Sequence, residues 1–255
     1  MAGVAQLHDV VYVILERCPE IFTFCATKHE FLTSVDFHHM GQLVDIAACE
    51  LTSRLYIGDN NWYSLTPSRI CRVSADLTDV DLWLPRSESS DAFRLGKLSV
   101  TSARLLVTPV DIKQLLQFDA DGNEVKRIQL PSSARHAVES PTGTFIVSYR
   151  NLVREVNTVG EVLRQFSGSP LISLSAEYIA VDSQGNIFVA DRNNYRILLL
   201  DSQLALRRVV IDEHQLNKKS VLRLCYVEQS GRLLVASYEV DSTRRNLAVF
   251  GVLRQ

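Results

Sequence analysis

The sequence lacks the cysteine patterns that would point to a metal or to a disulfide framework. It has five cysteines, an odd number, none spaced C-x-x-C and none accompanied by a His-x-x-x-His run. These features exclude a zinc or disulfide scaffold. We therefore expect reduced cysteines, no bound metal, no cofactor and a cytoplasmic location.

Long hydrophobic runs and a strong charge of either sign are also missing. The apolar run Val10 to Leu15 is too short for a signal peptide and has no basic residues before it. No segment approaches the ~18 apolar residues of a membrane span. The net charge of −2 argues against DNA binding through bulk charge. We expect a monomer that contacts neither DNA nor a membrane.

Familiar catalytic motifs are absent as well, because no G-x-S-x-G elbow and no phosphate-binding loop occurs. The stretch DADGNE, Asp119 to Glu124, resembles the start of a calcium loop but lacks its remaining ligands. We interpret it as a hairpin turn.

What the sequence has is a repeated pattern of short strands. In IAVDSQGNIFVADRNNYRILLLDS, the apolar runs Ile179 to Val181, Ile187 to Ala190 and Ile197 to Leu200 are separated by turns, and Arg207 to Ile211 follows. This spacing predicts a four-stranded antiparallel meander. The second strands of further copies align at Arg54, Arg104, Thr144, Asn186 and Arg232, with a weaker copy before them. Six copies at intervals of about 40 to 50 residues predict a β-propeller of six four-stranded blades.

One copy closely resembles an NHL repeat, through Ala180, Val181, Asp182, Gly185, Asn186, Val189, Asp191, Asn194, Arg196 and Ile197. A second match runs through Gly58, Asp59, Arg69 and Ile70. The resemblance implies an all-β, six-bladed propeller of the NHL or TolB-like type. We expect residues 1–255 to form one such domain. Either one blade has three strands, or the chain is a fragment of a longer one.

The resemblance also bears on function. NHL propellers are mostly interaction platforms, many of them in tripartite-motif ubiquitin ligases, where they bind protein substrates or single-stranded RNA. Related six-bladed enzymes place metal ligands where the first strands of the blades begin. The alignment puts Ile46, His136, Tyr178 and Leu224 at that position, with Gly96 or Lys97 in the degenerate copy. Only His136 among them has a side chain that can bind a metal, and one histidine does not hold a catalytic zinc, so we expect no enzyme.

Charged residues separate between the two ends of the predicted blades. The end where first strands begin is rich in arginine, and the other end is rich in acids. The acids have an alternative explanation, because Asp is favoured in turns for backbone reasons. We expect Asp59, Asp182 and Asp191 to accept hydrogen bonds from turn amides. Trp62 and Tyr63 lie in the long loop NNWYSLTPS, where Trp62 either binds a partner or packs on a neighbouring blade.

The leading hypothesis is a non-enzymatic module that binds a protein or peptide, such as the substrate-recognition part of a ubiquitin ligase. Single-stranded RNA binding on the same end is the alternative, and a metal-dependent lyase or hydrolase is the third hypothesis. The predicted partner-binding residues are Trp62, Tyr63, Arg69, Lys97, Arg135, His136, Arg150, Arg192 and Tyr195.

Overall fold

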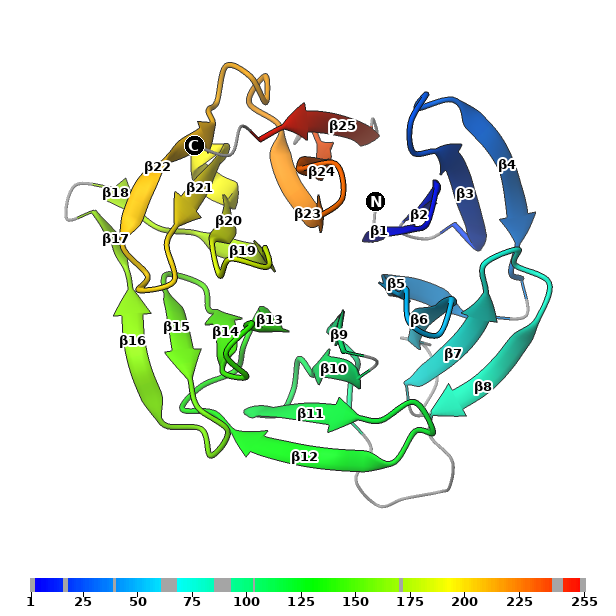
Figure 1. The fold of residues 1–255 in the computed structure, drawn as a ribbon, viewed down its shortest axis with the longest axis horizontal. Helices are drawn as coiled ribbons and strands as arrows, with labels where there is room; N and C mark the ends of the chain where they lie inside the picture. The colour runs from blue at the N-terminus through cyan, green and yellow to red at the C-terminus, as the bar shows by residue number, and fades with distance from the viewer. Residues whose placement is uncertain are drawn as a thin grey trace. The chain divides into compact units, whose positions relative to one another are not determined.

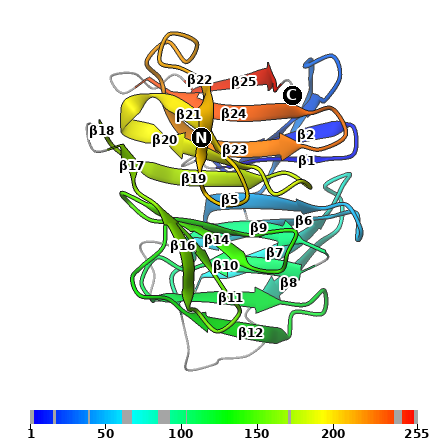
Figure 2. The same ribbon diagram turned by 60° about the vertical axis from the view of Figure 1, so that its left-hand side comes forward.

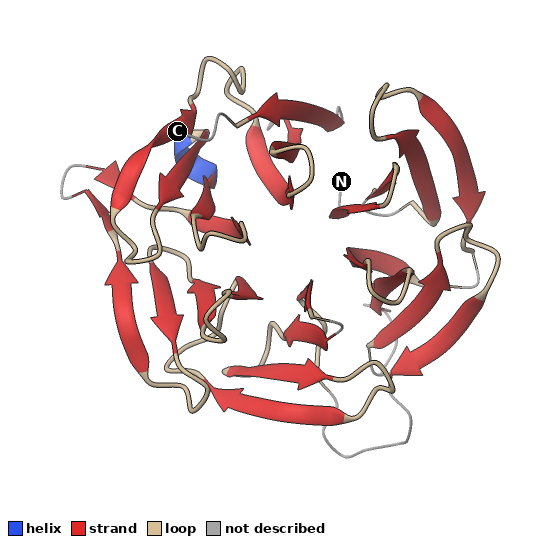
Figure 3. Ribbon diagram, viewed as in Figure 1, coloured by secondary structure: helices blue, strands red, loops and turns tan. Residues whose placement is uncertain are grey.

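The computed structural model describes residues 3–15, 18–38, 40–60, 68–84, 93–102, 104–169, 172–239 and 245–252. Within these ranges the protein consists of β-strands and one short 3-10 helix, Arg192–Asn194 (Figure 3). None of the described helical structure has the length and apolar character needed to cross a membrane. The all-β prediction is confirmed.

The chain divides into two compact units, Met1–Arg127 and Ile128–Gln255. Unit 1 contains three four-stranded antiparallel sheets, in each of which the strands follow in sequence order. They are β1 (Gly3–Leu7), β2 (Val10–Ile14), β3 (Glu20–Cys25) and β4 (Phe31–Asp36); β5 (Gln42–Cys49), β6 (Arg54–Asn60), β7 (Arg69–Ser74) and β8 (Val80–Leu84); and β9 (Lys97–Thr101), β10 (Arg104–Thr108), β11 (Gln114–Phe118) and β12 (Glu124–Gln129), the last of which crosses the boundary at Arg127.

Unit 2 contains two further four-stranded sheets and one three-stranded sheet (Figure 1). They are β13 (His136–Glu139), β14 (Phe145–Ser148), β15 (Val153–Val156) and β16 (Val162–Phe166); β19 (Ala176–Val181), β20 (Ile187–Asp191), β21 (Arg196–Leu200) and β22 (Leu206–Ile211); and β23 (Ser220–Val227), β24 (Arg232–Tyr238) and β25 (Arg245–Gly251). A two-stranded hairpin, β17 (Gly168–Ser169) with β18 (Ile172–Ser173), was not predicted.

The predicted repeat agrees with the observed strands. β6, β10 and β24 begin at the aligned residues Arg54, Arg104 and Arg232, and β14 and β20 begin one residue after Thr144 and Asn186. The strands form because short runs rich in β-branched and aliphatic residues alternate with turns. Six blade-like sheets result, and the propeller fold class is confirmed. The division into two units leaves the single domain over 1–255 as a prediction.

Within each unit, the first strands of successive sheets lie side by side. In unit 1, β1 packs beside β5 and β5 beside β9, while in unit 2 β13 packs beside β19 and β19 beside β23. In unit 2, the sheet of β20 lies between the sheets of β14 and β23, and β20 is buried along its whole length. The first strands therefore bring the same position of several sheets together.

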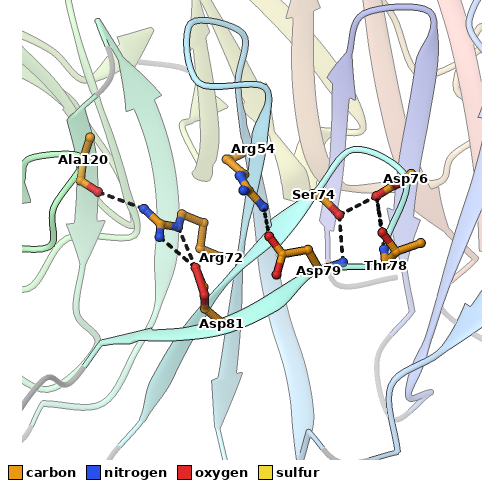
Figure 4. Close-up of polar contacts among 8 residues, drawn as sticks. All are labelled: Arg54, Arg72, Ser74, Asp76, Thr78, Asp79, Asp81 and Ala120. Atoms are coloured by element: carbon orange, nitrogen blue, oxygen red, sulfur yellow. Dashed lines mark hydrogen bonds and ion pairs between the residues drawn. The ribbon is translucent and has the colours of Figure 1, made fainter.

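Side chains of one sheet also hold the turns of the next sheet in unit 1. The Tyr12 hydroxyl donates to the carbonyl oxygen of Ala75 at 2.5 Å. Arg72 and Trp83 both donate to the carbonyl oxygen of Ala120, at 3.3 and 3.1 Å. Figure 4 shows Arg72 reaching from β7 to this turn. Each of these bonds ties a turn that follows a third strand to the preceding sheet.

Candidate functional site

The strand pairing identifies one equivalent position in the first strand of five sheets. It is the first-strand residue that pairs with the equivalent residue of each second strand, and it is the first or the fourth residue of its strand. Its occupants are Gly3, Asp45, Lys97, His136 and Arg223, paired with Ile14, Gly58, Thr108, Ser148 and Ala236. We call it the entry position.

The sequence alignment assigned this position wrongly in two sheets. It placed Ile46 and Leu224 there by counting back a fixed eight residues from Arg54 and Arg232. Cys49 pairs with Arg54 and Val227 pairs with Arg232 across turns of four residues, and the register from these turns puts the entry position one residue earlier. A constant-spacing alignment does not detect differences in the length of the turn between the first and second strands. Asp45 and Arg223 are therefore the entry residues that sequence reasoning missed, and His136 is not the only polar residue at this position.

Two entry residues approach a matching backbone N–H group of the next sheet within their unit. The buried Asp45 carboxylate accepts a hydrogen bond from the backbone N–H of Leu98 at 2.8 Å. In unit 2, the N–H of Ile179 approaches Nδ1 of His136 at 3.3 Å. Leu98 and Ile179 occupy matching positions, because each pairs with the third residue after the aligned residue of its copy: Val107 after Arg104 and Val189 after Asn186. The entry residues thus act first as ties between adjacent first strands.

His136, Tyr178 and Arg223 form a buried cluster in unit 2, with exposed fractions of 2%, 3% and 5%. Arg223 Nη1 lies 3.0 Å from His136 Nε2, and its guanidinium lies 5.3 Å from the centre of the Tyr178 ring. A guanidinium only donates hydrogen bonds, so Nε2 of His136 accepts from Arg223. A neutral imidazole then carries its proton on Nδ1, so the approach of the Ile179 N–H is a packing contact and not a second accepted hydrogen bond. The cluster joins β13, β19 and β23, and its burial keeps these side chains away from a partner on the loops.

Three arginines from the predicted set lie at the end of unit 2 where first strands begin. Arg135 and Arg150 are exposed, and the N–H of Arg135 donates to Ser148 O at 2.8 Å, which places both beside the end of β14. Arg192 is partly exposed and donates to the Tyr238 hydroxyl at 2.7 Å. We call Arg135, Arg150 and Arg192 the arginine end of unit 2.

A chain of contacts connects the two sheets that carry the arginine end. The Ser148 hydroxyl donates to the carbonyl oxygen of Glu177 at 3.1 Å, and the Glu177 carboxylate lies 3.9 Å from Arg192 Nη1. The 3-10 helix that presents Arg192 ends at Tyr195, which is partly exposed and has a left-handed backbone with φ of 49°. The arginine end is therefore supported by defined backbone contacts.

The predicted residues of unit 1 are placed differently. Arg69 forms an ion pair with Asp59, whose carboxylate is buried. Lys97 is partly exposed at an entry position. Trp62 and Tyr63 lie outside the described residues. Arg69 thus has a structural role in addition to any role in binding.

The expected role of the strand-ending aspartates is confirmed for two of them. Asp182 accepts hydrogen bonds from the N–H groups of Gln184 and Asn186, at 3.0 and 2.8 Å. Asp191 accepts from the N–H of Ser175 at 2.8 Å and pairs with Arg196. Asp59 instead takes the side chain of Arg69 from the next strand.

The acidic end also consists largely of structural contacts. Asp76 accepts from the Ser74 hydroxyl at 2.5 Å and from the N–H and hydroxyl of Thr78 (Figure 4). These hydrogen bonds, led by the one from Ser74, lower the pKa of the Asp76 carboxyl. In DADGNE, Asp119 accepts from the N–H groups of Asp121 and Asn123, which confirms the hairpin turn. Turn chemistry thus accounts for Asp76 and Asp119 at the acidic end.

Across the described residues, no group of three or more His, Cys, Asp or Glu side chains is arranged to hold a metal ion.

Comparison with known proteins supports the fold. Residues 177–198 match the family model of the NHL repeat, which confirms the resemblance over this copy. No protein of curated function matches the sequence. Among solved structures, the chain is similar to a luciferin-regenerating enzyme, with 14% identity, a TM-score of 0.68 and coverage of 95% of this chain and 86% of the other.

Two further structures show how varied the proteins with this fold are. A streptogramin B lyase is 8% identical, with a TM-score of 0.63 and coverage of 100% of this chain and 83% of the other. A chain of a nidogen/laminin complex is 14% identical, with a TM-score of 0.65 and coverage of 84% and 81%. Since enzymes and a component of a protein complex share the fold at such low identity, the fold alone does not assign a function.

Proposed function

We propose that this chain is a non-enzymatic interaction module and that it binds an acidic segment of a protein partner at the arginine end of unit 2. The observation that carries this proposal is the exposure of Arg135 and Arg150 beside the partly exposed Arg192, on loops of two adjacent sheets. Guanidinium groups bind carboxylates through paired hydrogen bonds, so three arginines at one end favour an acidic ligand.

The arginines elsewhere differ in their surroundings. Arg54, Arg72, Arg127, Arg164 and Arg207 each form an ion pair with an Asp or Glu of the same sheet. Those pairs neutralise the charge locally. At the arginine end Arg192 also lies 3.9 Å from a carboxylate, that of Glu177, so the preference for an external anion rests on the exposed Arg135 and Arg150. A role as the substrate-recognition part of a ubiquitin ligase is a more specific form of this proposal and rests on the NHL resemblance.

The test uses substitutions that leave the internal ties intact. In the double variant Arg135→Ser/Arg150→Ser, two exposed side chains are shortened without touching His136, Arg192 or Arg69. The matched control is Arg104→Ser/Arg207→Ser, which removes the same charge from exposed positions at the opposite end. The probe is a labelled octapeptide of glutamate, and its binding is measured by fluorescence anisotropy at low and moderate salt.

We expect the natural sequence and the control to bind the acidic peptide, and the Arg135→Ser/Arg150→Ser variant to bind about tenfold more weakly. Equal binding by all three proteins would contradict the assigned surface. A random single-stranded RNA pool is tested in parallel. Steeply salt-dependent RNA binding without peptide binding would replace this proposal with nucleic-acid binding. A stoichiometric metal in the purified protein would instead support the lyase or hydrolase hypothesis.

A further inference from the structure

The sheet β23–β24–β25 has an incomplete outer edge. Among the described residues it contains three strands, while each of the other five blade sheets contains four. β25 pairs with β24 along one side, and no described strand pairs with its other side (Figures 1 and 2). In the five four-stranded sheets, the fourth strand pairs with this side of the third strand.

Along β25, the N–H and C=O groups of successive residues point alternately toward β24 and toward the open edge, and the pairing with β24 shows which residues point each way. The N–H of Val252 donates to Gly231 O at 3.1 Å, and these two residues continue the pairing of Gly251 with Arg232. In an antiparallel ladder, every second residue turns both its N–H and its C=O toward the same neighbour. Phe250 and Ala248 therefore bond toward β24, and Gly251, Val249 and Leu247 direct their backbone groups outward.

The side chains of β25 are also less covered than those of the other third strands. The residue equivalent to Leu247 is at most 1% exposed in every four-stranded sheet, namely Ile21, Ile70, Leu115, Val153 and Ile197. Leu247 is partly exposed, as are its neighbours from Asn246 to Phe250. The five complete sheets differ from this sheet in having a fourth strand hydrogen-bonded beside the third strand.

The fourth strands show which residue covers that position. The residue opposite it is Val35, Leu84, Phe166 or Ile211 in the four sheets with a recorded pairing. All four are large and apolar. An occupant of the β25 edge would need an extended backbone and a residue of this kind opposite Leu247.

We propose that the outer edge of β25 binds an extended segment of a partner protein, which adds as an antiparallel fourth strand and places an aliphatic or aromatic side chain opposite Leu247. Such strand addition draws its affinity from main-chain hydrogen bonds and its specificity from alternate side chains. A partner segment fits better than a second copy, because a contact limited to the seven residues Arg245–Gly251 is small against the roughly 1,200 Å² that stable dimers bury.

The probe is a labelled peptide with the sequence ALRRVVID, which is residues 205–212 of this chain and contains the fourth strand β22. It carries Ile211, which pairs with Ile197 in its own sheet. One control peptide has the same composition in scrambled order, and a second carries Ile211→Asp. Fluorescence anisotropy measures binding to the purified chain.

The protein variant is Val249→Pro, which removes an outward N–H that β24 does not use. Proline is tolerated on an edge strand when its nitrogen faces outward, so the fold should persist. The matched control is Val249→Thr, which keeps the N–H and a β-branched side chain. We expect the natural sequence and Val249→Thr to bind the peptide within about threefold of each other, and Val249→Pro to bind at least about tenfold more weakly.

Three results would overturn the proposal: no binding of ALRRVVID, equal binding of the scrambled peptide, or equal binding by Val249→Pro. The Ile211→Asp peptide tests the same idea on the unaltered protein and should bind at least about tenfold more weakly. Dimers in sedimentation velocity that Val249→Pro abolishes would overturn it in favour of a second copy. The Arg135→Ser/Arg150→Ser variant should bind this peptide normally, which separates this proposal from the previous one.

Discussion

At the scale of single residues, two buried carboxylates explain part of the NHL pattern. Asp59 is the second-last residue of β6 and Asp191 is the last residue of β20, with exposed fractions of 1% and 0%. Each pairs across the ladder with an arginine of the third strand, Arg69 or Arg196. A buried carboxylate needs such a partner because desolvation of its charge is costly. The Asp and Arg of the motif are thus two halves of one contact.

This contact predicts a stability effect at Arg69. The substitution Arg69→Ala would leave the Asp59 carboxylate buried without its guanidinium, and we expect a loss of about 3 kcal/mol in the free energy of unfolding. Thermal denaturation should show a melting temperature lower by about 6 to 12 °C. Arg54→Ala is the control, since its partner Asp79 has a side chain that is 60% exposed. That exposed pair should contribute less than about 1 kcal/mol. Similar melting temperatures for Arg69→Ala and the natural sequence would contradict this account.

At the scale of an element, the turn between β7 and β8 is held by one carboxylate. The hydrogen bonds from Ser74 and Thr78 lower the pKa of Asp76 in the folded protein. A carboxyl group whose pKa is lower when folded stabilises the fold above its unfolded pKa of about 3.9. This contribution is lost as the pH falls through the folded value.

The pH dependence can be measured with Asp76→Asn. We expect this variant to melt at a lower temperature than the natural sequence at pH 7, because its amide is a weaker acceptor for the Ser74 and Thr78 groups. The difference should shrink as the pH falls below about 4, where the carboxyl of the unfolded chain takes up a proton, and it should disappear once the pH is below the lowered pKa of the folded protein. Asp121→Asn is the control, and its effect on melting should be small at every pH. A difference for Asp76→Asn that stays constant from pH 7 to pH 3 would contradict the assignment.

Elements were predictable from the sequence to different extents. The meander of β19 to β22 was predicted closely, because its apolar runs and its Gly185 turn are local signals. The entry position was not, because the turns between the first and second strands differ in length from sheet to sheet, as the four-residue turns before Arg54 and Arg232 show. The burial of His136 depends on contacts with Arg223 and Ile179, far away in the sequence, and no local pattern indicates it.

At the scale of the whole molecule, the division into two compact units raises the question of whether both units unfold in one cooperative transition. Both tryptophans, Trp62 and Trp83, belong to unit 1, so tryptophan fluorescence reports on unit 1 and far-UV circular dichroism reports on both units. If residues 1–255 form one domain, urea unfolding should give coincident transitions by the two methods. A fluorescence transition at a clearly different urea concentration would mean that the units unfold separately.

The bonds that hold turns to neighbouring sheets have a consequence for how such a sequence can diverge. Tyr12, Arg72 and Trp83 bond to the carbonyl oxygens of Ala75 and Ala120, and every amino acid supplies such an oxygen. The residue that supplies the accepting carbonyl oxygen can therefore be replaced by another amino acid, provided that the turn keeps its backbone conformation. A fold built on such contacts tolerates divergence among its copies, which fits a chain in which one copy of the repeat matches the family model.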